Sequence, residues 1–247
     1  MDVDSKHSQL AIRRVARSFD EPLPRLYSSL RFVIFRQRFM QEIGQYIPER
    51  GRVLDIGCGV GLFANYFGQI KPGVSLEAFD IDARRVELAR ASAARLELAN
   101  VAYTAADVTK LPFSGEIQAA YMIDTLHHIP RPAVMRLLFH LSQMIVPDGW
   151  IVIKDVLTTP VLKGLFTLAL DRLAVGRGYV RYWEIAEMKS ILAALGFEAF
   201  HHEMVDWIPY SQVLFTGRKI GEPDPDFLEK FLPGGHYAWG RRRAHLP

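Results

Sequence analysis

The chain has 247 residues, of which 49% are hydrophobic and 23% charged, proportions that are typical of a globular protein with a full core. No apolar run reaches the roughly 18 residues that a membrane-spanning helix needs, and the N-terminus lacks the basic and apolar regions of a signal peptide, so a cytoplasmic protein is expected. The single cysteine excludes an internal disulfide and a multi-cysteine metal centre, and no metal site is expected.

The net charge of +3 is distributed unevenly along the chain. Residues 1–52 hold 10 Lys and Arg against 6 Asp and Glu, residues 53–216 hold 14 against 17, and residues 217–247 hold 6 against 4. Basic ends suit contact with an anionic partner or a membrane surface, although such ends are commonly only solvated. Because the basic residues are spread over both ends, no nucleic-acid partner is expected.

Residues 1–49 are predicted to form an N-terminal helical cap. Residues 1–25 are interpreted as a loose or partly helical entry with a break at Pro22 to Pro24. From Leu30 to Ile47 the apolar residues recur at helical spacing, and Pro48 ends the segment. Several arginines make this helix basic and amphipathic. We expect it to pack beside the core, with contact to a membrane or cover over a substrate as the alternative.

The rest of the chain is organised around a strand, a glycine turn and a helix. Val53 to Ile56 is predicted to be a buried parallel strand, and Leu62 to Phe67 has the apolar spacing of a helix. Between them, Gly57, Gly59 and Gly61 allow positive φ angles and a close approach of a ligand to the backbone. The N–H groups of the following helical turn face the same cleft. This context predicts a site for a nucleotide-like ligand.

Strands and helices alternate from this turn to about residue 156. The further predicted strands are Ser75 to Phe79, Val101 to Ala105, Gln118 to Ile123 and Trp150 to Ile153. The predicted helices between them are Ala83 to about Leu98, with Asp82 as its N-cap, and Pro132 to Val146. The alternation predicts a parallel sheet covered by helices on both faces.

The pattern changes after residue 156. A helical insert is expected over about 156–183, followed by a helix from Glu184 to Leu195. An antiparallel strand pair is predicted next, at Phe197 to Val205 and Tyr210 to Arg218. Residues 220–247 are expected to be a flexible tail. The predicted fold is therefore α/β and Rossmann-like: a doubly wound, mostly parallel seven-stranded sheet with an antiparallel last strand, plus the N-terminal helices.

An aspartate lies at or just after the end of five predicted strands. These residues are Asp55, Asp80, Asp107, Asp124 and Asp155. Right-handed crossovers place the carboxyl ends of parallel strands along one edge, which is where such sheets bind ligands. Aspartates are also common caps and turn residues, so about two of the five are expected to be structural.

Several segments together resemble one enzyme family. Residues 53–61, which read VLDIGCGVG, resemble the first motif of class I S-adenosylmethionine-dependent methyltransferases. Asp80, Asp107 before the Leu-Pro-Phe segment at 111–113, and the Leu-His-His segment at 126–128 resemble the later motifs in the same order. The last two segments look most like the branch that contains ubiquinone and menaquinone biosynthesis methyltransferases. The resemblance implies a methyltransferase core over residues 50–219 and S-adenosylmethionine as the cofactor.

The resemblance also implies roles for the first two strand ends. The three glycines of the turn would let the backbone pack against the methionine part of the cofactor, and Asp55 would face its ammonium group. Asp80, with Ile81 beside it, would accept hydrogen bonds from both ribose hydroxyls, since one carboxylate offers two oxygens.

The third and fourth strand ends would complete the cofactor site. Asp107 would hold the adenine amino group, with Val108 as its backbone and apolar neighbour. Ile123 and Asp124 would line the cleft near the sulfonium. The alternative for each aspartate is a cap or a turn.

Catalysis would depend mainly on in-line positioning of nucleophile, methyl group and sulfur. A base with a near-neutral pKa helps if the acceptor is a hydroxyl or an acidic carbon, and His127 or His128 could serve. In a helical turn these two side chains point about 100° apart, so one is expected to face the substrate; neither being catalytic is the alternative. Asp155 could orient that histidine or act as a base itself, whereas Lys154 is expected to be solvated.

The acceptor is expected to be a small hydrophobic or aromatic molecule, lipid-linked molecules included. This expectation comes from the aromatic and apolar residues of the cap and the insert, which are Tyr27, Phe32, Phe35, Leu165, Phe166, Leu168, Tyr179 and Tyr182. The same residues could simply form core. Whether oxygen, nitrogen or carbon is methylated, and the oligomeric state, stay open.

Three other functions match parts of the sequence. A dinucleotide-dependent oxidoreductase requires the spacing G-x-G-x-x-G, whereas this turn reads G-x-G-x-G. A methyltransferase acting on RNA or another macromolecule would suit the basic ends of the chain. A catalytically silent domain that only binds the cofactor also stays open.

Overall fold

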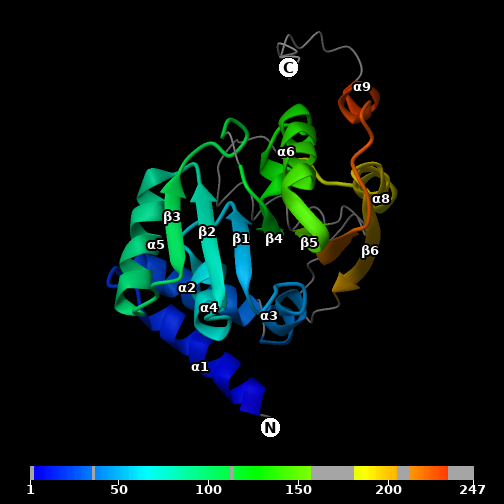
Figure 1. The fold of residues 1–247 in the computed structure, drawn as a ribbon. Coiled ribbons are helices and arrows are strands. Elements are labelled where there is room, and N and C mark those ends of the chain that lie inside the picture. The colour runs from blue at the N-terminus through cyan, green and yellow to red at the C-terminus, as the bar shows by residue number, and fades with distance from the viewer. Residues whose placement is uncertain (1–2, 35–36, 112–113, 157–180, 205–211, 233–247) are drawn as a thin grey trace, which may run out of the picture.

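The computed structural model of the protein describes residues 3–34, 37–111, 114–156, 181–204 and 212–232. At its centre lies a seven-stranded sheet in the order β3-β2-β1-β4-β5-β7-β6 (Figure 1). The strands are β1 (Gly51–Ile56), β2 (Val74–Asp80), β3 (Val101–Ala105), β4 (Ile117–Ile123), β5 (Ile145–Val156), β6 (Phe197–Met204) and β7 (Gln212–Lys219).

The sheet has the predicted arrangement of strand directions. β1 to β5 pair in parallel, with Asp55 of β1 opposite Ala78 of β2 and Tyr121 of β4. β7 runs antiparallel to both β5 and β6. The expected doubly wound sheet with an antiparallel last strand is therefore confirmed.

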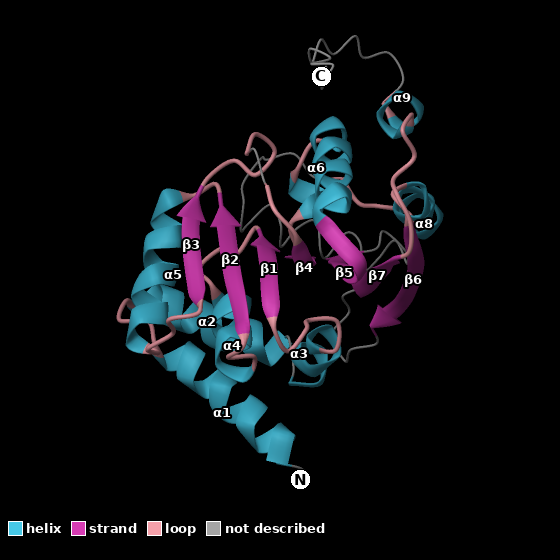
Figure 2. Ribbon diagram, viewed as in Figure 1, coloured by secondary structure: helices cyan, strands magenta, loops and turns pink. Residues whose placement is uncertain are grey.

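Helices surround the sheet (Figure 2). They are α1 (Val3–Arg17), α2 (Pro22–Ile34), α3 (Gln37–Gly44), α4 (Leu62–Ile70), α5 (Ala83–Arg95), α6 (Arg131–Met144), α8 (Ile185–Ala194) and α9 (Phe227–Phe231), with the short 3₁₀ helix η1 (Leu126–His128). Of the helices in the described ranges, none combines the length and the apolar character needed to cross a bilayer.

Two apolar cores lie on opposite faces of the sheet. Val53 and Tyr121 belong to the core shared with α1, α3 and α4, whereas Leu54 and Met122 belong to the core shared with α6 and α8. Successive strand side chains point to opposite faces, so neighbouring residues enter different cores. This is why the central parallel strands are apolar at nearly every position.

The N-terminal cap differs from the prediction. The expected helix from Leu30 to Ile47 is two helices, α2 and α3, and α2 begins at Pro22, where a break was expected. Proline is tolerated in the first helical turn because the N–H that it lacks would have no partner there. The entry, expected to be loose or partly helical, is a regular helix, α1, anchored to α4 by the hydrogen bond between the Ser8 and Tyr66 hydroxyls (2.6 Å).

The expectation of a flexible tail from residue 220 is wrong for residues 220–232. α9 packs on α6, where Phe227 is fully buried and stacks against Phe139 with ring centroids 5.8 Å apart. The Arg131 guanidinium donates a 2.6 Å hydrogen bond to the Phe231 carbonyl. Apolar burial therefore orders this segment. The rest of the predicted tail, the insert from 157 to 180 and the turn at 206–209 lie outside the described residues.

Candidate functional site

A cavity of about 1210 Å³ opens at the carboxyl ends of β1 to β4. Glycine-turn residues, the start of α5 and the α2 side chains Tyr27 and Arg31 contribute to its wall. The predicted site residues that line it are Gly57, Gly59, Asp80, Ile81, Asp107, Val108, Ile123, Asp124, His127 and His128. The predicted residues Asp55, Gly61 and Asp155 do not line it. The fold thus places ten of the predicted site residues around one cavity.

The glycine turn has the backbone conformation that only glycine adopts easily. Gly57 and Gly61 have φ angles of 81° and 80°, and a Cβ on Gly57 would lie 2.3 Å from the Thr125 Oγ1 atom. A Cβ on Gly59, in contrast, would meet no atom within 4 Å. At Gly57 the turn therefore packs closely against Thr125, just after β4. At Gly59 it is open toward the cavity, which leaves space for a ligand to approach the backbone.

The Asp80 carboxylate is held rigidly at the wall of the cavity. One oxygen accepts a hydrogen bond from the Gly59 N–H (2.8 Å), and the other accepts one from the Asp82 N–H (2.9 Å). Each oxygen keeps a further acceptor position, so the pair fits a vicinal diol. Ile81 beside it is 74% exposed and offers apolar surface to the same cavity. Asp82 caps α5 as predicted.

Asp55 lies buried next to the turn. Its carboxylate accepts a 3.0 Å hydrogen bond from the Tyr121 hydroxyl. Burial raises the pKa of Asp55 to about 8, the Tyr121 hydrogen bond opposes the shift, and the charge of Asp80 adds to it. Burial also raises the pKa of the Cys58 thiol, and the two aspartates raise it further. Cys58 therefore stays a neutral thiol, which fits a small packing residue and not a nucleophile.

Asp107 forms a turn as well as lining the cavity. Its Oδ1 atom accepts hydrogen bonds from the Thr109 hydroxyl (2.6 Å) and N–H (3.1 Å), and its Oδ2 atom lies 2.9 Å from the Lys110 Nζ atom. The Thr109 hydroxyl is the main cause of the lowered pKa of Asp107. This is the ordinary turn-forming arrangement of aspartate.

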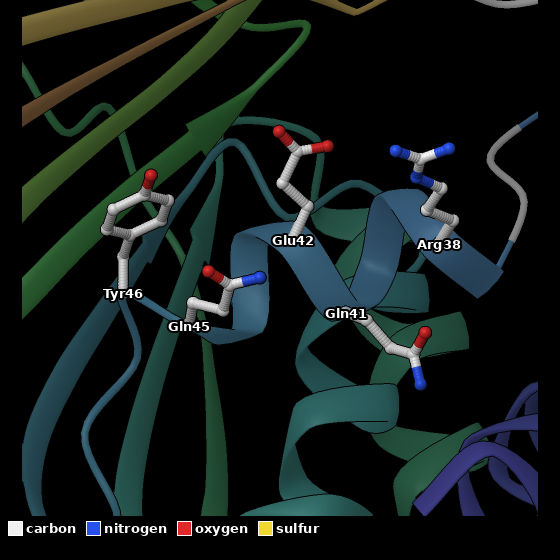
Figure 3. Close-up of a pocket in the computed structure, with 5 residues that line it drawn as sticks. All are labelled: Arg38, Gln41, Glu42, Gln45 and Tyr46. Atoms are coloured by element: carbon white, nitrogen blue, oxygen red, sulfur yellow. The ribbon is translucent and has the colours of Figure 1, made fainter. Parts of the chain in front are cut away.

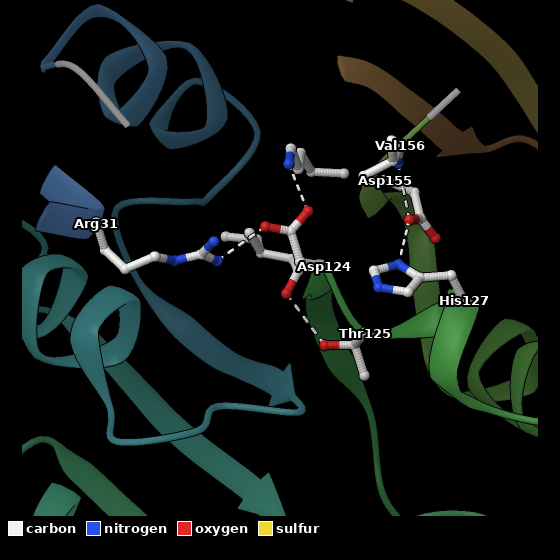
Figure 4. A network of polar contacts seen from close by, with 8 residues as sticks. Arg31, Asp124, Thr125, His127, Asp155 and Val156 are labelled. Atoms are coloured by element: carbon white, nitrogen blue, oxygen red, sulfur yellow. Dashed lines mark hydrogen bonds and ion pairs between the residues drawn. The ribbon is translucent and has the colours of Figure 1, made fainter. Parts of the chain in front are cut away.

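Asp124 lies between two cations (Figure 4). Arg31 Nη2 donates a 2.8 Å hydrogen bond to Asp124 Oδ2, and the Lys154 ammonium donates to Asp124 Oδ1. Burial alone would raise the pKa of Asp124, but the charges of Lys154 and Arg31 outweigh burial and hold this pKa well below its ordinary value. Sequence reasoning assigned Arg31 only to a basic helix face, since its 93-residue separation from Asp124 leaves no local signal.

The expectation that Lys154 is solvated is wrong. Its side chain has 0% exposure. The Phe39 ring of α3 covers it, with the ammonium 5.9 Å from the ring centroid. β5 is a strand with helices on both faces, so neither face leaves a side chain in solvent at this position.

His127 and Asp155 form a buried pair. The His127 Nδ1 atom lies 2.5 Å from Asp155 Oδ1, and both side chains are 1% exposed. Asp155 Oδ1 also accepts a 2.8 Å hydrogen bond from the Val156 N–H. The His128 ring packs on His127 with centroids 3.9 Å apart. One of the two histidines was expected to face the substrate, and both line the cavity.

The residues expected to contact an acceptor lie in different parts of the molecule. Tyr27 lines the cavity and is half exposed. Phe32 is buried in the core under the cap, so an acceptor role for Phe32 is wrong. Tyr182 contacts His127 with ring centroids 6.0 Å apart. The remaining five, Phe35, Leu165, Phe166, Leu168 and Tyr179, lie outside the described residues.

A second, smaller hollow of about 320 Å³ runs along α3 (Figure 3). Its lining side chains are Arg38, Gln41, Glu42, Gln45 and Tyr46. None of the predicted site residues belongs to it. In the part of the chain that the structure describes, no three His, Cys, Asp or Glu side chains are grouped as a metal site would require. The cavity at the strand ends is therefore the candidate site.

Comparison with known proteins identifies the family. A family model described as a methyltransferase domain matches residues 29–202. The ubiquinone biosynthesis O-methyltransferase of Alkalilimnicola ehrlichii is 29% identical over 114 residues, which are 45% of this chain and 44% of that protein. Methyltransferase GfsG of Streptomyces halstedii is 28% identical over 132 residues, 49% of this chain and 46% of that protein. The matched part thus spans about half the length of these curated relatives.

A solved structure shares the fold. Magnesium protoporphyrin IX methyltransferase from Synechocystis PCC 6803, determined with bound S-adenosylhomocysteine, has a TM-score of 0.56 and 17% identity, over 74% of this chain and 80% of that one. The seven-stranded sheet with its glycine turn is consistent with the family that the model matches. The chain belongs to the methyltransferase domain family and, within it, to the class I S-adenosylmethionine-dependent methyltransferases.

Proposed function

We propose that the protein transfers a methyl group from S-adenosylmethionine to a hydroxyl oxygen of a small, largely apolar acceptor, with His127 as the base. The observation that carries this proposal is the buried His127–Asp155 pair, which lies at the same cavity as Asp80 and the glycine turn. The relatives named ubiquinone biosynthesis O-methyltransferases support oxygen as the methylated atom.

The cavity residues fit the cofactor. S-adenosylmethionine supplies an electrophilic methyl group when it is bound. Asp80, held by two backbone N–H groups, would accept the ribose hydroxyls, and Gly59 leaves room for the methionine part. Asp107 and Val108 would flank the adenine.

The other side of the cofactor would meet two further residues. Ile123 lines the cavity next to the sulfonium position that we propose. Asp55 would compensate the charge of the ammonium group from behind the turn, because a cation nearby favours the ionised carboxylate.

The His127–Asp155 pair has the arrangement of a general base. Asp155 accepts the proton on Nδ1 and thereby selects the tautomer with a lone pair on Nε2. As the acceptor oxygen attacks the methyl group, Nε2 would take the hydroxyl proton, and the Asp155 carboxylate would stabilise the imidazolium that forms. The His128 ring, packed on His127, would limit rotation of the base.

Charge pairing at this end favours a hydroxyl over a cationic amine. Among the described residues, Asp155 is paired with His127, and Asp124 is paired with Arg31 and Lys154. An ammonium group would therefore have to compete with the partners that both nearby carboxylates already have. A neutral hydroxyl needs only the base.

The mouth of the cavity supports an apolar acceptor. α2 exposes a row of apolar side chains at helical spacing, and two of them, Leu23 and Tyr27, line the cavity. The row consists of Leu23, Leu26, Tyr27 and Leu30. Such a face suits a hydrophobic acceptor and, as part of the proposal, its uptake from a membrane surface by a protein that works in the cytoplasm.

Labelled methyl transfer tests the proposal. The protein is incubated with deuteriomethyl S-adenosylmethionine and a metabolite extract, and products are identified by mass spectrometry. We expect a labelled methyl ether and no labelling with the Asp80→Ala variant. Label in the RNA or protein fraction would point to a macromolecular acceptor. Cofactor binding without any labelled product would leave a silent binding domain.

A further inference from the structure

Asp124 joins three separate parts of the molecule. One oxygen of its carboxylate accepts a hydrogen bond from Arg31 of α2, and the other accepts one from Lys154 of β5. The Asp124 N–H in turn donates to the Lys154 carbonyl (3.0 Å). The residues come from the cap, from the end of β4 and from the strand that carries Asp155 (Figure 4). The ion pairs therefore connect the N-terminal helices with the turn that leads to His127.

This turn has an unfavourable backbone conformation. Asp124 has a φ angle of 52°, in the left-handed region that residues other than glycine seldom occupy. The next residue, Thr125, packs under Gly57, and its carbonyl accepts the His128 N–H (3.1 Å). A change at Asp124 would thus move both the glycine turn and η1. Contacts outside the turn must stabilise it.

The two cations are not equivalent. Lys154 is fully buried, and without Asp124 it would be an uncompensated charge in the interior, so this pair belongs to the fold. Arg31 lines the cavity with 21% of its side chain exposed. Its removal leaves a neutral Asp124–Lys154 pair. The Arg31 contact is therefore additional to what the core needs.

We infer that Arg31 is a positioning residue: through Asp124 it holds the turn 124–127 in the conformation that presents His127 to the acceptor. The inference rests on the proposed function only in taking His127 as the base. The second oxygen of Asp124 is free to rotate toward the cavity once Arg31 is gone, because Lys154 holds only the first. The turn then loses the Arg31 contact and keeps its contacts to Lys154, Asp155 and Arg181.

Hydrogen exchange followed by mass spectrometry tests the inference on the intact protein. In Arg31→Gln we expect the amides of residues 124–129 to exchange about fivefold faster than in the wild type, since local opening becomes easier. The ¹⁵N signals of the His127 ring should shift or broaden. Arg31→Lys should restore part of the protection because it keeps the charge without the fork of the guanidinium.

Arg25→Gln is the matched control. Arg25 is exposed on the same helix, outside the cluster, and its variant should match the wild type in every measurement. Binding of S-adenosylmethionine should stay within about twofold in all variants, because Asp80, which would hold the ribose, is positioned by Gly59 and Asp82 and not by Arg31. With an acceptor in hand, kcat of Arg31→Gln should fall about tenfold while KM for the cofactor stays constant.

Two results would overturn the inference. One is an unchanged exchange rate at 124–129 together with unchanged His127 signals. The other is faster exchange throughout β4 and β5, which would make the ion pair a general support of the fold. Both readouts are independent of methyl transfer, so failure of the proposed function and failure of this inference can be told apart.

Discussion

Asp55 is a carboxyl group whose surroundings disfavour its charge. Its pKa is about 8 in the folded protein because of burial, against the ordinary value of 3.8 in the unfolded chain. Between these pH values the folded state holds a proton that the unfolded state has lost. The contribution of Asp55 to stability therefore falls as pH rises from about 4 to about 8, and the cost is complete above that range.

Asp55→Asn should remove this cost. We expect the variant to be more stable than the wild type at pH 8.5, by about 1.4 kcal/mol for each unit by which burial raises the pKa of Asp55. The two should be nearly equally stable near pH 3, where the Asp55 carboxyl is protonated in both the folded and the unfolded state. Urea unfolding of the ligand-free protein at the two pH values measures the difference. A constant difference at both pH values would show that Asp55 does not titrate in this range.

Asp80 should contribute mainly to the affinity for the cofactor. Asp80→Ala removes two hydrogen bonds to a charged acceptor, so we expect the dissociation constant of S-adenosylmethionine to rise about 100-fold or more. Calorimetric titration measures it. Asp82→Ala offers the contrast two residues further on: loss of the α5 cap should lower stability by about 1 kcal/mol and change affinity little. Unchanged affinity in Asp80→Ala would refute the ribose assignment.

At the scale of elements, the parallel pairing of β4 with β5 creates the proposed catalytic pair. The ends of these neighbouring strands lie together, with Ile123 opposite Lys154. η1 follows β4 and turns His127 back over the end of β5, where its Nδ1 atom lies 2.5 Å from Asp155 Oδ1. A 28-residue separation in the chain thus becomes a hydrogen bond.

His127→Gln and Asp155→Asn should lower kcat by similar factors of about 100 or more, and the double variant should be little worse than either single one, because both act as one unit. Steady-state assays with the acceptor found by labelling measure these rates. His201→Gln, at an exposed position on β6, is the control and should keep full activity. Full turnover in His127→Gln would exclude it as the base.

At the scale of the molecule, the two ends of the described chain complete the two cores. α1 and α3 cover one face of the sheet, and α9 closes the other face against α6. The two ends differ in their relation to the cavity. α2 of the cap contributes to the cavity wall, whereas no residue of α9 lines the cavity.

Phe227→Ala tests the role of the C-terminal segment. The side chain is fully buried and stacks between Phe139 and Phe231, so the cavity left behind should cost about 3–5 kcal/mol of unfolding free energy. Chemical denaturation measures it, while the affinity for S-adenosylmethionine below the transition should stay at the wild-type value. A loss under 1 kcal/mol would mean that α9 contributes little to the core.

The parallel sheet, the glycine turn and the order of the strand-end aspartates are predictable from the amino-acid sequence. They follow from local apolar periodicity, from the φ angles that glycine allows and from the fixed hand of strand crossovers. The burial of Lys154 against Asp124, the contact of Arg31 with Asp124 and the place of Phe227 in the core are visible only in the folded chain. Burial and charge pairing depend on which distant segments come into contact, and the residue type at one position does not indicate that contact.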